Sequence, residues 1–175
     1  LATLHSTVGV GRQFDMRFCD RAALIYASGF GAGYSPIAPG TAGSAAAIPL
    51  YFLAFDWLNR PGWAWAGYLA FVALWFAAGV WASSRAETLL RKTDPGFVCI
   101  DEVVGYFLCV FALPNPIPWH AFVVAFFVFR LFDIWKPEPI DRLQRLHGGL
   151  GIMIDDLLAG VYTCLVLQLI YRIAL

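Results

Sequence analysis

Long runs of apolar residues constrain this chain more than any other feature of its sequence. Two of them, at 63–83 and 154–174, reach the roughly 20 residues that an α-helix needs to cross a bilayer. Three shorter runs lie at 44–58, 97–113 and 119–135. Hydrophobic residues make up 60% of the chain and charged residues 14%, whereas soluble domains average about 45–50% and about 25%. The sequence therefore predicts an all-α, polytopic membrane helix bundle of about five apolar helices.

The three shorter runs leave the number of full spans open. Two of them are at the lower limit of spanning length and contain charged residues. The run at 44–58 reaches that length only if its helix extends back toward Pro36. The first, third and fourth helices are therefore predicted either as spans or as short, partly re-entrant helices.

The distribution of positive charge predicts an orientation. If all five runs cross the membrane and the N-terminus is inside, nine lysines and arginines fall in inside segments and two fall outside. This asymmetry follows the positive-inside rule, so we expect a cytoplasmic N-terminus. The whole chain has 12 basic and 12 acidic residues, and this balance argues against a nucleic-acid partner.

Four polar segments interrupt the apolar runs, at 29–44, 101–102, 129–137 and 147–156. The five-span topology places all four at the cytoplasmic ends of the helices. A charge at the centre of a membrane helix costs about 2.5–3.5 kcal/mol, so acids gathered on one side favour a single functional site. The carboxylates in question are Asp101, Glu102, Asp133, Asp155 and Asp156.

All five carboxylates are candidate metal ligands. Oxygen ligands without a histidine–cysteine cluster suit a hard cation, Mg²⁺ above all, as one or two ions. Arg130 and Lys136 each lie three residues from Asp133, on one face of a helix, and are candidate phosphate-binding cations. Thr41 and Ser44 are expected to cap the first apolar helix, whose free N–H groups attract a phosphate.

Several of these features have a simpler interpretation when each is taken alone. The glycines at 29–33 match neither a P-loop nor a dinucleotide-binding pattern, and alone they indicate an ordinary turn. Arg130 and Asp133 alone indicate a structural ion pair. Glu87 and Asp94 are interpreted as solvated loop charges. The clustering of the acids on one side favours the functional interpretation.

The polar segments together resemble the bacterial phosphatidylglycerophosphatase A family. Four motifs occur in the family's order, and none of their charged positions departs from the family pattern. They are GAGYSPIAPGTAGS (31–44), IDEVVG (100–105), FRLFDIWKPEPI (129–140) and HGGLGIMIDDLLAG (147–160). The resemblance implies a Mg²⁺-dependent phosphatase of the bacterial inner membrane. It would convert the phospholipid phosphatidylglycerophosphate to phosphatidylglycerol and phosphate.

The sequence also leads to a hypothesis of how the chain is divided and which residues act. Residues 1–28 are predicted as a cytoplasmic or interfacial segment, and 29–175 as the membrane-embedded catalytic domain. His147, whose side chain has an ordinary pKa near 6.5, would protonate the leaving oxygen. Water or a carboxylate could be the nucleophile. The predicted catalytic residues are Asp101, Glu102, Asp133, Asp156 and His147.

Other classes fit the sequence less well. An ion-coupled transporter is the alternative, because buried acids often mark ion paths. Transporter sites, however, tend to lie at the bilayer midplane between repeated halves, and no repeat is visible. The pattern of a CDP-alcohol phosphotransferase is absent. None of the four cysteines begins a Cys-x₅-Arg motif, so they are interpreted as apolar filling.

Overall fold

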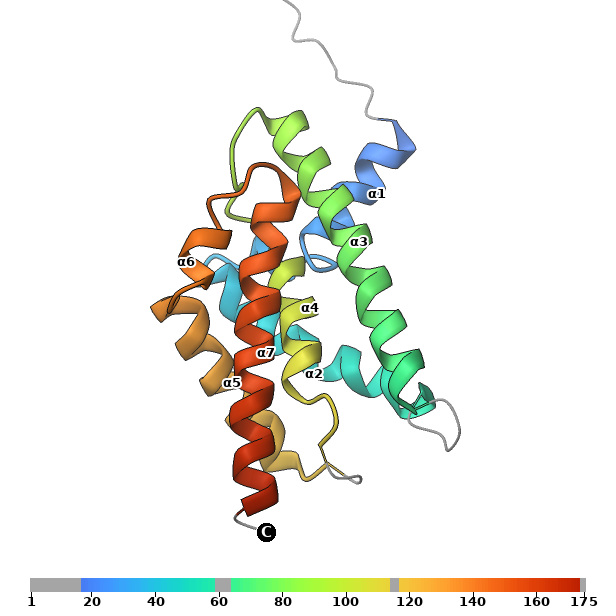
Figure 1. Ribbon diagram of the computed structural model, residues 1–175. Helices are drawn as coiled ribbons and strands as arrows, with labels where there is room; N and C mark the ends of the chain where they lie inside the picture. Colours follow the sequence, from blue (N-terminus) through green and yellow to red (C-terminus); the bar gives the residue numbers. More distant parts are fainter. Residues whose placement is uncertain (1–16, 59–63, 114–116, 174–175) are drawn as a thin grey trace, which may run out of the picture.

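The computed structural model describes residues 17–58, 64–113 and 117–173, which form seven α-helices and one 3₁₀ turn. Figure 1 shows α3 and α7 running along most of the length of the molecule, with α1 and α6 near the upper end. The all-α prediction is confirmed for these residues. The elements are α1 (Phe18–Ala27), η1 (Ala32–Tyr34), α2 (Pro39–Leu58), α3 (Ala64–Leu90), α4 (Ile100–Cys109), α5 (Trp119–Trp135), α6 (Ile140–Leu143) and α7 (Gly149–Ile173).

Two helices are long and apolar enough to cross a membrane, by length and composition. They are the segments Trp65–Leu90 of α3 and Gly149–Arg172 of α7. They correspond to the two longest apolar runs of the sequence. Residues 1–16 of the predicted N-terminal segment lie outside the described residues. The five-span topology also predicts turns at 59–62 and 114–118 that face outside, and these residues lie wholly (59–62) or mostly (114–118) outside the described ranges.

Helix α4 is short and lies at the centre of the bundle. It has 10 residues, and at 1.5 Å per residue it measures about 15 Å, half the thickness of a bilayer core. It packs mainly against α7 and α2. All of its residues except Asp101 and Leu108 are buried. The run at 97–113 therefore forms a short, protein-covered helix, which is one of the two forms that the sequence left open.

Helix α2 begins at Pro39, earlier than the apolar run that predicted it. Proline suits the first position of a helix, because its missing N–H would have no partner there. This start corrects one prediction: Thr41 and Ser44 lie inside the helix and do not cap it. The Ser44 hydroxyl is buried and donates a hydrogen bond to the Gly40 carbonyl oxygen at 2.9 Å.

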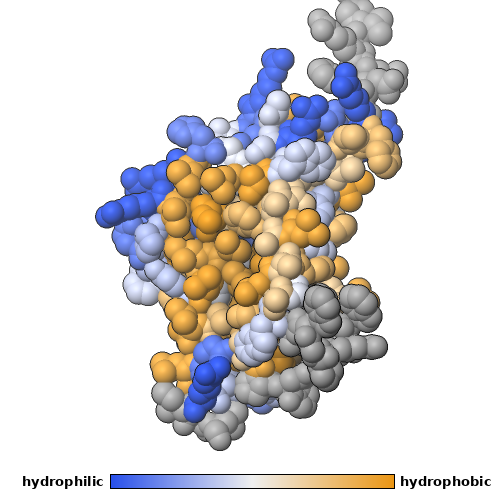
Figure 2. Space-filling view, turned by 45° about the vertical axis from the view of Figure 1, so that its right-hand side comes forward, coloured by the Kyte–Doolittle hydropathy of each residue, from blue (hydrophilic) through white to orange (hydrophobic). Residues whose placement is uncertain are grey.

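Large apolar side chains are exposed along the outer sides of the long helices. Figure 2 shows a broad band of hydrophobic residues on one face, with hydrophilic residues gathered toward the upper end. Exposed apolar surface of this extent marks a surface that contacts lipid or another protein. Examples on α5 and α7 are Phe127, Leu131, Ile134, Leu165 and Leu169.

Candidate functional site

A cavity of about 290 Å³ lies where α2, α4 and α7 begin and where α3 and α5 end. Lys136 lines it, together with residues of the loop before α4. Polar segments that are far apart in the sequence therefore meet at one end of the bundle, as the topology predicted. The lining includes every carboxylate singled out from the sequence: Asp101, Glu102, Asp133, Asp155 and Asp156.

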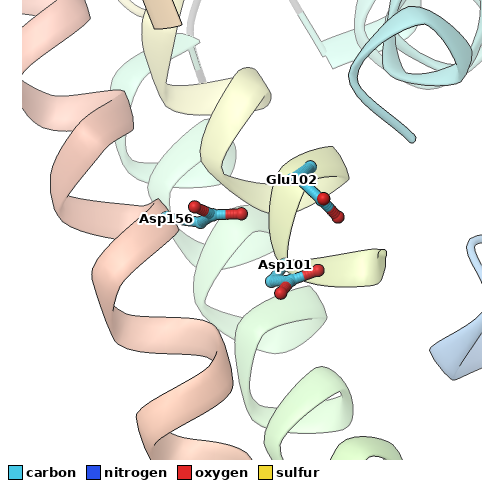
Figure 3. A group of neighbouring side chains, drawn as sticks. All are labelled: Asp101, Glu102 and Asp156. Carbon is cyan, nitrogen blue, oxygen red and sulfur yellow. The ribbon is translucent and has the colours of Figure 1, made fainter. Parts of the chain in front are cut away.

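Three of these carboxylates form a compact group. One oxygen from each of Asp101, Glu102 and Asp156 lies within 4.8 Å of the others. Figure 3 shows Asp156 pointing from α7 toward the first turn of α4, which contains Asp101 and Glu102. Three carboxylate oxygens gathered in this way can hold one hard divalent cation.

Two glycines let α4 and α7 approach closely enough to form this group. A Cβ atom on Gly160 would lie 2.2 Å from the Gly105 carbonyl oxygen. A Cβ atom on Gly105 would lie 2.4 Å from the carbonyl oxygen of Asp156 itself. Small residues at helix contacts allow this close approach of backbones. The spacing of Gly105 and Gly160 therefore places Asp156 beside the acids of α4.

Two basic side chains form ion pairs with carboxylates of the site. Lys136 Nζ donates to Asp155 Oδ2 at 2.6 Å. Burial disfavours the charge of Lys136, but the hydrogen bond to Asp155 raises its pKa above the ordinary value. Arg130 Nη1 lies 2.5 Å from Asp133 Oδ2 and 3.9 Å from Glu102 Oε1. Both cations predicted to bind phosphate therefore contact carboxylates of the site.

Some carboxylate oxygens of the site have no partner. Asp101 Oδ1, Glu102 Oε2 and Asp155 Oδ1 are buried and accept no hydrogen bond from any described residue. Leaving a buried acceptor unsatisfied costs about 1–3 kcal/mol, and more when it is charged. A divalent cation held by the compact group would lie beside Asp101 and Glu102, whose unpartnered oxygens it could satisfy. The residues present therefore fit the Mg²⁺ ion that the sequence led us to expect.

Two further acids line the cavity, although the sequence led us to interpret them as solvated loop charges. Glu87 lies near the end of α3, and its Oε1 accepts a hydrogen bond from the Asp94 backbone N–H at 3.0 Å. Both residues belong to the lining. The lining then has seven carboxylates and one basic residue, Lys136. In the five-span topology both residues fall in an inside segment, on the same side as the other acids. That shared side was the one sequence signal that could have identified them.

Four predicted site residues do not line the cavity: Thr41, Ser44, Arg130 and His147. His147 is exposed in the loop before α7. Its neighbours Leu146 and Gly148 both belong to the lining, so the backbone of this loop reaches the cavity. The roles predicted for these residues stay predictions, and Ser44 has its hydroxyl bonded inside α2.

The fold and the cavity define a class of protein: an α-helical bundle with two candidate membrane spans and an acidic site suited to a divalent cation. Comparison with known proteins identifies the family. The sequence profile of phosphatidylglycerophosphatase A matches residues 25–171. The chain belongs to this family of lipid phosphatases, which disfavours the transporter alternative.

Individual relatives support the family. The chain is 40% identical over 147 residues to phosphatidylglycerophosphatase A of Escherichia coli, covering 83% of this chain and 81% of the relative. It is 37% identical over 143 residues to phosphatidylglycerophosphatase A of Haemophilus influenzae, covering 81% and 84%. A Bacteroides thetaiotaomicron protein, provisionally named phosphatidylinositol-3-phosphatase, is 40% identical over 149 residues, covering 80% and 87%. No solved structure matches the chain.

Proposed function

We propose that this protein hydrolyses phosphatidylglycerophosphate to phosphatidylglycerol and inorganic phosphate, and that Mg²⁺ is required. The family supplies the reaction class, and the cavity supports the choice of metal. The observation that carries most weight is the group of Asp101, Glu102 and Asp156, in which one oxygen from each residue lies within 4.8 Å of the others.

We further propose that the site faces the cytoplasm at the bacterial inner membrane. The excess of lysine and arginine in the segments assigned to the inside supports this orientation. Residues 1–28 would then be a cytoplasmic or interfacial segment, and 29–175 the catalytic domain. A site at the end of the bundle lies where the headgroup of a phospholipid would be, and the exposed apolar band would contact the acyl chains.

The carboxylates have the role of holding the metal in this proposal. Asp101, Glu102 and Asp156 would hold one Mg²⁺ ion, and Asp133 and Asp155 are available to a second. Mg²⁺, when bound, supplies positive charge for the phosphate oxygens and acidifies a water molecule. Phosphate monoesters hydrolyse extremely slowly without catalysis, so a site of this kind must provide strong electrostatic stabilisation.

The remaining groups would bind phosphate and move protons. Hydrolysis joins a water oxygen to phosphorus, breaks the bond from phosphorus to the glycerol oxygen, and transfers one proton from the water to that oxygen. A cavity carboxylate can accept the proton, and His147 is proposed to donate one to the glycerol oxygen. Lys136 would neutralise a phosphate oxygen from within the cavity. Thr41 and Arg130 are proposed to support phosphate binding from beside it.

A carboxylate nucleophile is the alternative to water. Attack by a cavity carboxylate would form an aspartyl phosphate, which water would then hydrolyse. Brief incubation with substrate labelled in the terminal phosphate, followed by acid quenching, distinguishes the two routes. Labelled protein indicates the covalent route, and its absence during turnover indicates direct attack by water.

The name of the Bacteroides relative makes a phosphatidylinositol 3-phosphate lipid the second candidate substrate. The test compares phosphatidylglycerophosphate, phosphatidylinositol 3-phosphate and phosphatidate in mixed micelles, each with Mg²⁺ and with EDTA. We expect the highest kcat/KM for phosphatidylglycerophosphate and no release in EDTA. Preference for phosphatidylinositol 3-phosphate would replace the proposed substrate, and release that survives exhaustive chelation would refute the metal requirement.

A further inference from the structure

The glycine-rich segment at 29–43, which runs into the first turns of α2, has a role that phosphate binding does not explain. Among its glycines, Gly40 lines the cavity, whereas Gly29, Gly31, Gly33 and Gly43 do not. Gly29 and Gly31 have φ values of +56° and +103°, which favour glycine, but backbone conformation does not account for Gly33 and Gly43. The positions of Gly29, Gly33 and Gly43 are explained by what a side chain at each of them would touch.

Three of these glycines surround Cys99. A Cβ atom placed on Gly29 would lie 2.8 Å from Cys99 Sγ. On Gly33 it would lie 3.2 Å from Cys99 Sγ and 1.8 Å from the carbonyl oxygen of Phe97, two residues before Cys99. On Gly43 it would lie 2.9 Å from both the Cβ and the carbonyl oxygen of Cys99. Real Cβ atoms essentially never approach closer than 3.0 Å. The segment therefore forms a closely fitted pocket around one cysteine side chain.

Hydrogen bonds fix Cys99 in this pocket. Its backbone N–H donates to the Ala27 carbonyl oxygen at 3.0 Å, at the end of α1. Its thiol donates to the Ser28 carbonyl oxygen at 3.2 Å. Cys99 is completely buried. The buried thiol is therefore used as a hydrogen-bond donor within the protein.

Cys99 also begins the helix that contains the acids. It is the N-cap residue of α4, and its carbonyl oxygen accepts the N–H of Val103 at 3.3 Å. No side chain caps this helix. Asp101 and Glu102 follow two and three residues later, within the first turn. The position of that turn therefore depends on how Cys99 is held.

We propose that Cys99 is a positioning residue, and that the glycine-rich segment holds it so that Asp101 and Glu102 face Asp156. This inference rests on the proposed function, because it assumes that these carboxylates bind a divalent cation. It assigns Gly29, Gly33 and Gly43 to the placement of α4, whereas Gly40 lines the cavity. These glycines would thus position the acids through α4 and would not themselves contact the phosphate of the substrate.

The test compares two cysteines at opposite ends of α4. Cys99→Ala removes the thiol beside the acids, and Cys109→Ala removes an equally buried thiol from the last residue of the helix. Mn²⁺, which can replace Mg²⁺ at oxygen ligands, is titrated into the full chain in detergent, and free Mn²⁺ is measured by electron paramagnetic resonance. Thermal unfolding is recorded for each variant.

We expect Cys99→Ala to weaken Mn²⁺ binding about tenfold, as loss of a group behind a metal ligand does. Cys109→Ala should lower the melting temperature but leave the affinity within about twofold. Cys99→Ser, which keeps a donor of similar size, should recover most of the affinity. If the alanine variants do not fold, the Cys99→Ser and Cys109→Ser pair provides the same comparison, with a smaller difference expected in the same direction.

A double-mutant cycle isolates the contact with the glycine-rich segment. Gly29→Ala should weaken Mn²⁺ binding more in the native chain than in the Cys99→Ala chain, because the clash with the sulfur is then gone, whereas the strain of a positive φ is the same in both. Unchanged affinity in Cys99→Ala, equal losses in the two cysteine variants, or fully additive losses in the cycle would overturn the inference. A native chain that binds no Mn²⁺ and releases no phosphate would overturn the proposed function, and this inference with it.

Discussion

Replacing Gly160 by alanine tests how strongly activity depends on the close contact of α4 and α7. The new Cβ would lie 2.2 Å from the Gly105 carbonyl oxygen, whereas ordinary contacts begin at 3.4 Å. The helices must therefore separate locally by about 1.2 Å, since a backbone oxygen has no rotamer to move into. A misplacement of about 1 Å can reduce catalysis about 100-fold. We expect that loss in kcat/KM, with about 1–3 kcal/mol lost in stability.

The assay needs a control that adds the same methyl group without moving backbones. Gly79→Ala provides it, because its Cβ would meet Cε and Sδ of Met153, at the flexible end of a side chain. Phosphate release, Mn²⁺ affinity and thermal unfolding are measured for both variants in detergent. A folded Gly160→Ala protein with native kcat/KM, or an equal loss in Gly79→Ala, would refute the reasoning.

Three further predictions follow from named contacts. Gly40→Ala should abolish most activity, because its Cβ would lie 2.1 Å from Glu102 Oε1; native phosphate release from the folded variant would contradict this. Lys136→Met should raise KM and lower kcat/KM about tenfold or more, and a change in neither would exclude phosphate binding by this side chain. Asp20 has a pKa below the ordinary 3.8 because of its hydrogen bond from Arg85. Its ionised form therefore stabilises the protein above about pH 4, and this contribution disappears as pH falls through the lowered pKa. Asp20→Asn should lower the melting temperature at about pH 7 and have little effect at about pH 3, and an equal effect at both would refute it.

The sequence predicted which residue types form the site better than it predicted the packing that brings them together. Five acids within an apolar chain, all near the same ends of predicted helices, were sufficient to predict that they meet, since an isolated charge is costly there. The prediction used only the number of membrane crossings between successive acids, which places all of them on the same side. The structure brings the same five into one cavity, even though α4 is too short to span a bilayer core.

Long-range packing explains what the sequence did not show. Nothing in residues 29–43 indicates that three glycines fit around Cys99, which is more than 50 residues away in the sequence. Glu87 and Asp94 have the local pattern of ordinary solvated residues. Their place at the cavity depends on how the loop before α4 folds back.

Uncertain helix boundaries were a second limit on what could be predicted from the sequence. Thr41 was expected to cap α2, and the start of that helix at Pro39 places it inside the first turn. Arg130 was assigned to phosphate from its spacing to Asp133, and that spacing fits an ion pair equally well. Arg130 does form ion pairs with Asp133 and Glu102, and its role in phosphate binding stays a prediction.

Metal-dependent phosphate release tests the central claim most directly. Release from phosphatidylglycerophosphate is measured with Mg²⁺ and with EDTA for the native chain, for Asp156→Asn, and for Asp141→Asn as a control. Asp141 makes an exposed ion pair with Arg145 and does not line the cavity. The account predicts Mg²⁺-dependent release by the native and Asp141→Asn proteins and a loss of at least about 100-fold in Asp156→Asn. Equal release by all three folded proteins, or release that is unchanged in EDTA, would contradict it.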